Sequence, residues 1–181
     1  NLENDHKYGV FEVGMSNKGE IRKLSSLVKP DIAIITNIGE AHIENFDNLN
    51  GIAKAKSEII EKINEGGFLI LNRDDKYFDY LLKRTKKRKI NVLSFGLSSK
   101  ASARLINNRV HKNYNALHFR VLNKNIYLKV KNINSLIISN ILSTLLTLHV
   151  LDLDLSKIVN FQDNFQLVEG RGKTHSILRY K

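Results

Sequence analysis

Residues 36–42 and the more distant Lys56 are the side chains of this sequence best suited to chemistry. The first segment reads Thr-Asn-Ile-Gly-Glu-Ala-His and continues a β-branched apolar run, Ile32–Thr36, which lies between a proline and a glycine. Such a run predicts a fully buried parallel strand. Open α/β sheets bind ligands at the carboxyl ends of their strands, so residues 36–42 are expected at a ligand-binding edge.

Lys56 lies on the apolar side of a helix that is predicted from Asn48 to Ile63. It follows Ile52 by four residues, which places both on one helical stripe, whereas Lys54 faces elsewhere. The charged residues expected on other faces are Glu58, Glu61 and Lys62. Burial disfavours the ammonium form of a lysine, lowers its pKa and makes the neutral, nucleophilic amine available. The alternative is a lysine that lays its stem on apolar surface and extends its ammonium to water.

A second strand is predicted at Tyr8–Val13, and it carries a carboxylate, Glu12, two residues before Gly14. Where a chain leaves a sheet, a carboxylate can hold Mg²⁺ against nucleotide phosphates. A glutamate at a strand end can equally be a solvated or capping residue, and histidine alone is a weak indication of a magnesium site. The metal-site hypothesis therefore depends on the group of residues rather than on any one of them.

Several motifs resemble those of the Mur ligases in order and spacing. These motifs are Phe11–Met15, Gly19–Ile21, Thr36–His42, Phe46 and Ile52–Ile59. The resemblance is dense from Tyr8 to Asp75 and stays collinear to Arg171. Within the family it points to the members that add D-alanyl-D-alanine to UDP-N-acetylmuramoyl-tripeptide in peptidoglycan precursor synthesis. Another Mur ligase or a folylpolyglutamate synthase-like ligase is the alternative.

The resemblance implies ATP-dependent amide formation through an acyl phosphate, with ATP and Mg²⁺ as cofactors. It implies that Lys56 is carbamylated, since a neutral amine can attack carbon dioxide. It also implies that Glu12 serves one magnesium ion, while His42 and the Lys56 carbamate serve a second. Carboxylate-like oxygens suit such a hard cation.

The same resemblance assigns ATP binding to Asn37, Asn140 and Arg171. Asn140 matches an asparagine that approaches adenine in the family, although Leu136 stands where the family has a histidine. An ordinary asparagine on a helix surface is the alternative for Asn140. A basic turn before a strand is the alternative for Arg171.

No phosphate loop is expected in this sequence. Gly170–Thr174 contains Gly-Lys-Thr, but Leu167 occupies the position where the motif requires its first glycine. We therefore expect residues 1–181 to be a partial central ATP-binding domain without its first strand and phosphate loop. The UDP-binding and C-terminal domains of the family are expected to be absent, and the segment alone is expected to be inactive.

The predicted fold class is α/β, with a mostly parallel sheet flanked by helices and a small antiparallel sheet appended at about residues 101–131. The expected further elements are strands 67–71 and 90–95, a helix at 76–84, a hairpin of strands 116–121 and 125–130 with its turn at 123–125, and a helix from Asn132 onward with an apolar stripe at Leu136, Ile141, Leu145 and Leu148. Asp74 and Asp75 follow a strand end, where they could bind metal or cap the next helix.

The positive charge of the chain raises a rival hypothesis. Lys plus Arg number 29 against 18 Asp plus Glu, and Lys83–Lys89 is a dense basic run, so a non-catalytic nucleic-acid-binding domain is considered. No aromatic stacking platform interleaves with that run, which favours a solvated helix end and makes nucleic acid an unexpected partner. The sequence has no cysteine and no apolar run long enough to span a bilayer, so a cytoplasmic, monomeric enzyme is expected.

Overall fold

A computed structural model describes residues 3, 5–41, 43–131, 133–155 and 158 of the chain. Its strands follow the order β1-β2-β3-β4-β5-β6 in the sheet, with both parallel and antiparallel pairs. The predicted α/β class is confirmed. Contacts divide the chain into two units, one formed by residues 1–71 and 75–93 and the other by residues 72–74 and 94–181. No helix in the described part of the chain is long and apolar enough to cross a membrane.

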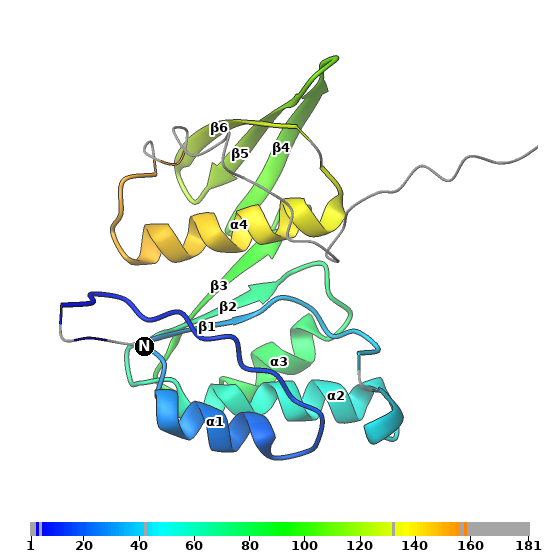
Figure 1. Ribbon diagram of the computed structural model, residues 1–181, viewed down its shortest axis with the longest axis vertical. Helices are drawn as coiled ribbons and strands as arrows, with labels where there is room; N and C mark the ends of the chain where they lie inside the picture. Colours follow the sequence, from blue (N-terminus) through cyan, green and yellow to red (C-terminus); the bar gives the residue numbers. More distant parts are fainter. Residues whose placement is uncertain (1–2, 4, 42, 132, 156–157, 159–181) are drawn as a thin grey trace, which may run out of the picture. The chain divides into compact units, whose positions relative to one another are not determined.

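Unit 1 is built from a parallel strand pair and helices that cover one of its faces (Figure 1). Its elements are α1 (Glu20–Val28), β1 (Ile32–Ile35), η1 (Ile43–Asn45), α2 (Leu49–Lys56), η2 (Ser57–Lys62), β2 (Phe68–Asn72) and α3 (Phe78–Arg84). The strands predicted at 32–36 and 67–71 and the helix predicted at 76–84 are therefore confirmed. Ala33 and Ile35 of β1 pack with Leu69 and Leu71 of β2 in the core under η2 and α3.

The helix predicted at Asn48–Ile63 forms, but it changes character in the middle. Asn48 caps α2 by accepting a hydrogen bond from the backbone N–H of Gly51. After Lys56 the chain tightens into the 3₁₀ segment η2. Ile52 and Ile60 are almost fully buried, so the apolar stripe holds the segment against the rest of unit 1 as its spacing predicts.

β1 is parallel, as expected, but it is not buried on both faces. Ile34 is 38% exposed between buried Ala33 and Ile35. Among the described strands β1 lies at one edge of the sheet, with β2 as its neighbour. A continuous apolar run predicts burial on both sides of the strand. In β1 the helices of unit 1 cover the side that carries Ala33 and Ile35, whereas Ile34 points to the other, partly exposed side.

The prediction of a strand at Tyr8–Val13 is wrong. The segment has no assigned strand, Val10 is 98% exposed and Phe11 is 52% exposed. Residue types that favour a pleated conformation need a neighbouring strand to complete the backbone ladder, and no described strand pairs with this segment. Glu12 consequently lies, exposed, in an irregular segment rather than at a strand end.

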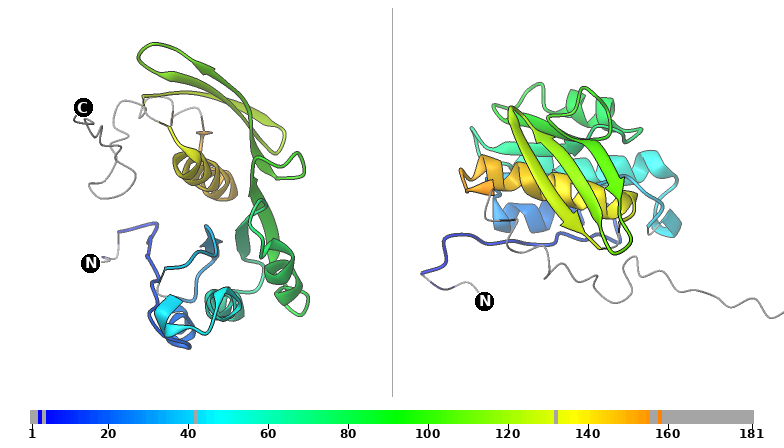
Figure 2. Two further views of the ribbon diagram at one scale, coloured as in Figure 1. Left: turned by 90° about the vertical axis from the view of Figure 1, so that its right-hand side faces the viewer. Right: turned by 90° about the horizontal axis from the view of Figure 1, so that it is seen from above.

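Unit 2 contains the antiparallel part of the sheet and one long helix (Figure 2). Its elements are the end of β3 (Asn91–Gly96), β4 (Ala103–Val110), β5 (Asn115–Val121), β6 (Lys124–Val130) and α4 (Ser135–Val150). β4 pairs in parallel with β3 and antiparallel with β5, which confirms the predicted small antiparallel sheet. α4 packs on β4 and β5.

Two details of unit 2 differ from expectation. The hairpin turn lies at Leu122–Asn123 rather than at 123–125, because Val121 pairs directly with Lys124. Leu122 there adopts a positive φ of 52°, a conformation that usually selects glycine or asparagine, so the residue types place the turn slightly late. In α4, Ile141 and Leu145 are buried as predicted, whereas Leu136 is 47% exposed and lies off the apolar stripe.

A close approach at the end of β3 gives a test of unit 2. Gly96 has φ +154°, and an added Cβ would lie 2.5 Å from Oδ2 of Asp74. The Asp74 carboxylate accepts hydrogen bonds from the backbone N–H groups of Leu97 and Ser98, so it is not free to move away. We expect Gly96→Ala to lower the free energy of unfolding by about 1–3 kcal/mol, as measured by urea denaturation.

Gly51→Ala is the matched control for that measurement. Gly51 lies within α2, and a Cβ there would be 3.5 Å from Phe46, an ordinary contact. Alanine stabilises a helix interior by roughly 0.5–1 kcal/mol relative to glycine, so this variant is expected to gain stability. A loss of equal size in both variants would contradict the steric account of Gly96.

Candidate active site at the end of strand β1

Lys56 meets the loop that follows β1. Its Nζ donates a hydrogen bond to the backbone carbonyl of Asn37 at 2.8 Å. The side chain is half-buried, and this burial lowers the pKa of the Lys56 amine, while the nearby Asp75 carboxylate opposes the shift. Lys54, two residues earlier on α2, is exposed. The helical spacing thus correctly distinguished the two lysines.

Asp75 connects the loop after β1 to the start of α3. One of its oxygens accepts the backbone N–H of Ile38 at 2.7 Å, and the other accepts the backbone N–H of Tyr77 at 2.7 Å. The second contact is of the helix-start type predicted for this residue. The contact to Ile38, 37 positions away, was not predicted, and the only signal for it was an acidic pair directly after a strand.

Asp74 has a different role from its neighbour. Its carboxylate accepts the backbone N–H groups of Leu97 and Ser98, at the turn that follows β3, and all three residues belong to unit 2. Neither predicted role, metal ligand or helix cap, describes these contacts. Asp74 holds a turn of the chain.

Glu58, two residues after Lys56, is a residue whose burial the sequence analysis predicted wrongly. It was expected on a solvent-facing side of the helix, but it is 6% exposed. Its Oε2 accepts the backbone N–H of Arg22 at 3.1 Å, and the Arg22 guanidinium forms two hydrogen bonds with Glu61, which lower the pKa of the Glu61 carboxyl. These bonds join α1 to η2, the segment that begins directly after Lys56.

The structure brings together two of the predicted site residues, Lys56 and Asn37. Glu12 is exposed in unit 1, and Asn140 is exposed on α4 in unit 2. His42 and Arg171 lie outside the described residues, as do Gly170–Thr174. Within the described residues, no group of three or more His, Cys, Asp and Glu side chains is arranged to hold a metal ion.

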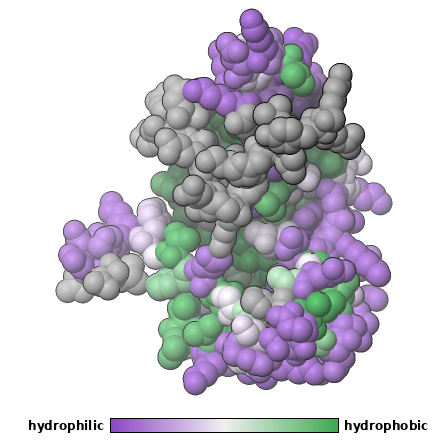
Figure 3. All heavy atoms as spheres, turned by 45° about the vertical axis from the view of Figure 1, so that its right-hand side comes forward, coloured by the Kyte–Doolittle hydropathy of each residue, from purple (hydrophilic) through white to green (hydrophobic). Residues whose placement is uncertain are grey.

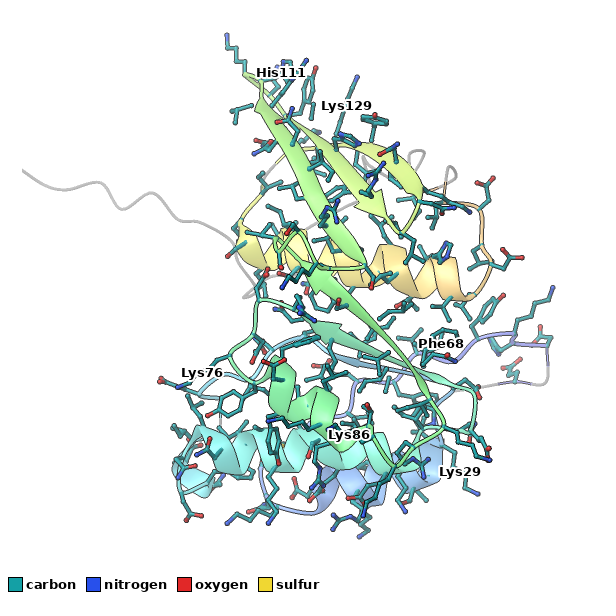
Figure 4. The ribbon with its side chains drawn as sticks, turned by 180° about the vertical axis from the view of Figure 1, so that it is seen from behind. Lys29, Phe68, Lys76, Lys86, His111 and Lys129 are labelled. Atoms are coloured by element: carbon teal, nitrogen blue, oxygen red, sulfur yellow. The ribbon has the colours of Figure 1, made fainter. Side chains whose placement is uncertain are left out.

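The arrangement has a definite chemical capability. A lysine with a lowered pKa presents more neutral amine at a given pH than an exposed lysine does. It lies at the carboxyl end of a parallel strand, where α/β sheets bind ligands, beside backbone and carboxylate oxygens. Figure 4 labels Lys76, which precedes α3 and follows Asp75 in the chain.

Comparison with known proteins identifies similar sequences. The family model of the Mur ligase middle domain matches residues 1–148. The UDP-N-acetylmuramoyl-tripeptide–D-alanyl-D-alanine ligase of Rickettsia prowazekii is 35% identical over 177 residues, which are 97% of this chain and 39% of that protein. The chain therefore spans about two fifths of the length of this curated relative.

Solved structures show the same fold. MurF from Acinetobacter baumannii superposes with a TM-score of 0.86 at 24% identity, covering 98% of this chain and 38% of that chain. MurF ligase from Thermotoga maritima, solved in complex with ADP, gives a TM-score of 0.74 at 23% identity, covering 89% of this chain and 36% of that one. The arrangement of elements described above is thus that of a known domain.

The lowered pKa of Lys56 predicts selective carbamylation. Only the neutral amine reacts with carbon dioxide, so at constant dissolved CO₂ the carbamate signal should rise with pH, and at a lower pH for Lys56 than for an exposed lysine. ¹³C NMR of the full-length protein in ¹³C-bicarbonate measures this signal. Lys56→Arg should remove it, because arginine is not deprotonated. The control Lys54→Arg, on the same helix, should leave it intact, and equal losses in both variants would contradict the assignment.

Proposed function

The chain belongs to the Mur ligase family, and we propose that it is part of the ATP-binding domain of a ligase that joins D-alanyl-D-alanine to UDP-N-acetylmuramoyl-tripeptide. The observation that carries this proposal is the half-buried Lys56, with its lowered pKa, hydrogen-bonded at the end of β1. The name of the similar Rickettsia protein supports the choice of substrates. ATP and the UDP-linked precursor are cytoplasmic metabolites in this proposal, so the enzyme acts there.

Lys56 is proposed to work as a carbamate. The ammonium first loses one proton; addition of CO₂ to the neutral amine then forms an N–C bond and releases a second proton, so a cation becomes an anion with the loss of two protons in all. The carbamate nitrogen keeps one hydrogen, so the existing donation to the Asn37 carbonyl can persist after modification. The local hydrogen bonding of Lys56 is therefore compatible with the modified side chain.

One magnesium ion is proposed to be held by Glu12, and a second by His42 and the Lys56 carbamate. The fit rests on the chemistry of the donors, because carboxylate and carbamate oxygens suit a hard cation, and on the readiness of Lys56 to lose its proton. When bound, magnesium neutralises phosphate charge. The residues of this chain supply position, with Lys56 held by the Asn37 carbonyl and Glu12 on the segment before α1.

The proposed reaction forms an amide from a carboxylate and an amine. The terminal carboxylate of the tripeptide takes the γ-phosphoryl group of ATP, and ADP leaves. The amine of D-alanyl-D-alanine then attacks the acyl phosphate carbonyl, loses a proton and displaces phosphate. Asn37, Asn140 and Arg171 are proposed to contact ATP. Alignment and neutralisation of charge account for the contribution of the protein, and no covalent enzyme intermediate is needed.

Substrate specificity is tested with the full-length protein that contains this chain. We expect ADP release that requires both UDP-N-acetylmuramoyl-tripeptide and D-alanyl-D-alanine. A coupled assay measures the ADP, and mass spectrometry identifies the product. Single amino acids and pteroylglutamate serve as controls for another Mur ligase and for a folylpolyglutamate synthase. Addition of a single amino acid in place of D-alanyl-D-alanine would assign the chain to another Mur ligase, and extension of pteroylglutamate in place of the tripeptide would assign it to a folylpolyglutamate synthase.

The role of Lys56 is tested separately in the same protein. Lys56→Ala removes the carbamate, so turnover should fall by roughly a hundred- to a thousandfold, the range found when one preorganised electrostatic group is lost. Short carboxylic acids should restore part of the activity by supplying the missing oxygens. Lys54→Ala, which changes an exposed lysine two residues away, should remain near wild type. Wild-type turnover in Lys56→Ala would remove the carbamate from the mechanism.

A further inference from the structure

The antiparallel sheet of unit 2 has one buried and one exposed face. Leu117, Phe119 and Val121 of β5 are buried, and they alternate with residues that face the other way. The same alternation in β6 leaves Tyr127 and Lys129 exposed. Cross-strand pairing brings exposed residues of neighbouring strands side by side on this outer face. The outer face consists of Arg104, Asn107 and Arg109 of β4, Ala116, His118 and Arg120 of β5, and Asn125, Tyr127 and Lys129 of β6.

Aromatic rings lie ordered in the middle of the outer face. His118 and Tyr127 are direct cross-strand partners, and their rings stack with centroids 4.5 Å apart and planes inclined by 17°. His118 Nε2 also lies 3.0 Å from the side-chain oxygen of Asn125, which holds the imidazole in place. Tyr127 is 63% exposed, so the ring face opposite His118 is accessible to another planar group.

A second aromatic pair stands at the adjoining hairpin end. His111 and Tyr114 stack with centroids 4.5 Å apart, and Lys129 Nζ lies 5.3 Å from the centre of the Tyr114 ring. Figure 4 shows His111 and Lys129 near this end of the sheet. Mostly hydrophilic residues cover the same end at the top of Figure 3. Aromatic rings and cationic groups are thus interleaved along the outer face.

The charge of this sheet is of one sign. The sequence from Ala103 to Lys131 contains no aspartate or glutamate. Its basic residues are Arg104, Arg109, Lys112, Arg120, Lys124, Lys129 and Lys131. A cavity of about 580 Å³ on the sheet is lined by Asn107, Arg109, His118, Tyr127 and Lys129 together with the apolar Ala116, Leu117 and Leu128. Its basic and aromatic side chains suit a ligand that carries negative charge and planar groups.

We propose that the outer face of β4–β6 binds single-stranded nucleic acid. A positive surface tracks the phosphates of a strand, and exposed rings stack on its bases without strong dependence on sequence. Arg109, Ala116 and Lys129 pair across the three strands at one end of the ring pair. Arg120 lies four residues from Ala116 along β5, about 13 Å at the usual rise of a strand. Cations therefore flank the ring pair on both sides, an arrangement that matches several consecutive nucleotides better than one.

This inference is independent of the proposed ligase function. The dense basic run Lys83–Lys89 has no aromatic platform beside it in the sequence, whereas the outer face of unit 2 combines both features in space. The relevant residues are spread over three strands, and only their register brings them together.

The test measures binding of the full-length protein to a fluorescein-labelled 12-nucleotide oligouridylate by fluorescence anisotropy at 50–200 mM NaCl. Tyr127→Ser should weaken binding about tenfold, because stacking on one base is lost, whereas Tyr127→Phe should bind like wild type. Arg109→Ala/Lys129→Ala should reduce the slope of log K against log salt by about 1.4, or roughly 0.7 for each lost phosphate contact on a single strand.

Lys86→Ala/Lys87→Ala is the charge-matched control, since both lysines are exposed in unit 1 (Figure 4 labels Lys86). It should change the affinity by less than about twofold. Equal losses in the two double variants, or no loss in Tyr127→Ser, would reduce the effect to net charge and overturn the proposal. Displacement of the oligouridylate by micromolar uridine monophosphate would indicate a mononucleotide site instead and would overturn the proposal. Binding to phosphatidylglycerol vesicles without binding to the oligonucleotide would likewise overturn it.

Discussion

The carboxylate of Asp75 links the loop after β1 to the start of α3, and the candidate site depends on this link. Its two oxygens accept backbone N–H groups from Ile38, in the loop after β1, and from Tyr77, ahead of α3. Hydrogen bonds to an ionised acceptor are stronger than those between neutral groups. Ile38 adjoins Asn37, whose carbonyl receives the Lys56 amine, so the same carboxylate fixes the position of that acceptor. A side chain after β2 thereby sets the geometry at the end of β1.

The interaction between Asp75 and Lys56 changes sign with the chemical state of the lysine. As an ammonium, Lys56 is attracted by this carboxylate, which partly offsets the effect of burial on its pKa. As the proposed carbamate, it would be a second anion beside Asp75, and like charges in a partly dehydrated site repel. A bound cation removes that repulsion. In the proposed ligase, modification of Lys56 and binding of magnesium therefore stabilise each other, as linked equilibria must.

Local periodicity predicted α2 and the orientation of Lys56, because a helix positions residues through neighbours three or four places away. It failed where the deciding partner is distant in the sequence. Glu58 is buried because Arg22 from α1 supplies its hydrogen bond, and no local pattern contains that information. The Tyr8–Val13 segment has strand-forming residues but no described strand beside it. The contact of Asp75 with Ile38 was missed for the same reason.

The distribution of positive charge shows why density along a sequence is a poor guide to a binding surface. Within the run Lys83–Lys89, Arg84 pairs with Glu61 at 3.6 Å, and Arg88 donates to the Ile63 carbonyl at 2.6 Å. Part of that charge therefore stabilises unit 1. In the β4–β6 sheet the basic residues are sparser, but strand alternation places Arg104, Arg109, Arg120 and Lys129 on one face, and cross-strand pairing aligns them with His118 and Tyr127. No acidic side chain within these strands neutralises them. The charge that remains after internal pairing, rather than the total, determines where a polyanion can bind.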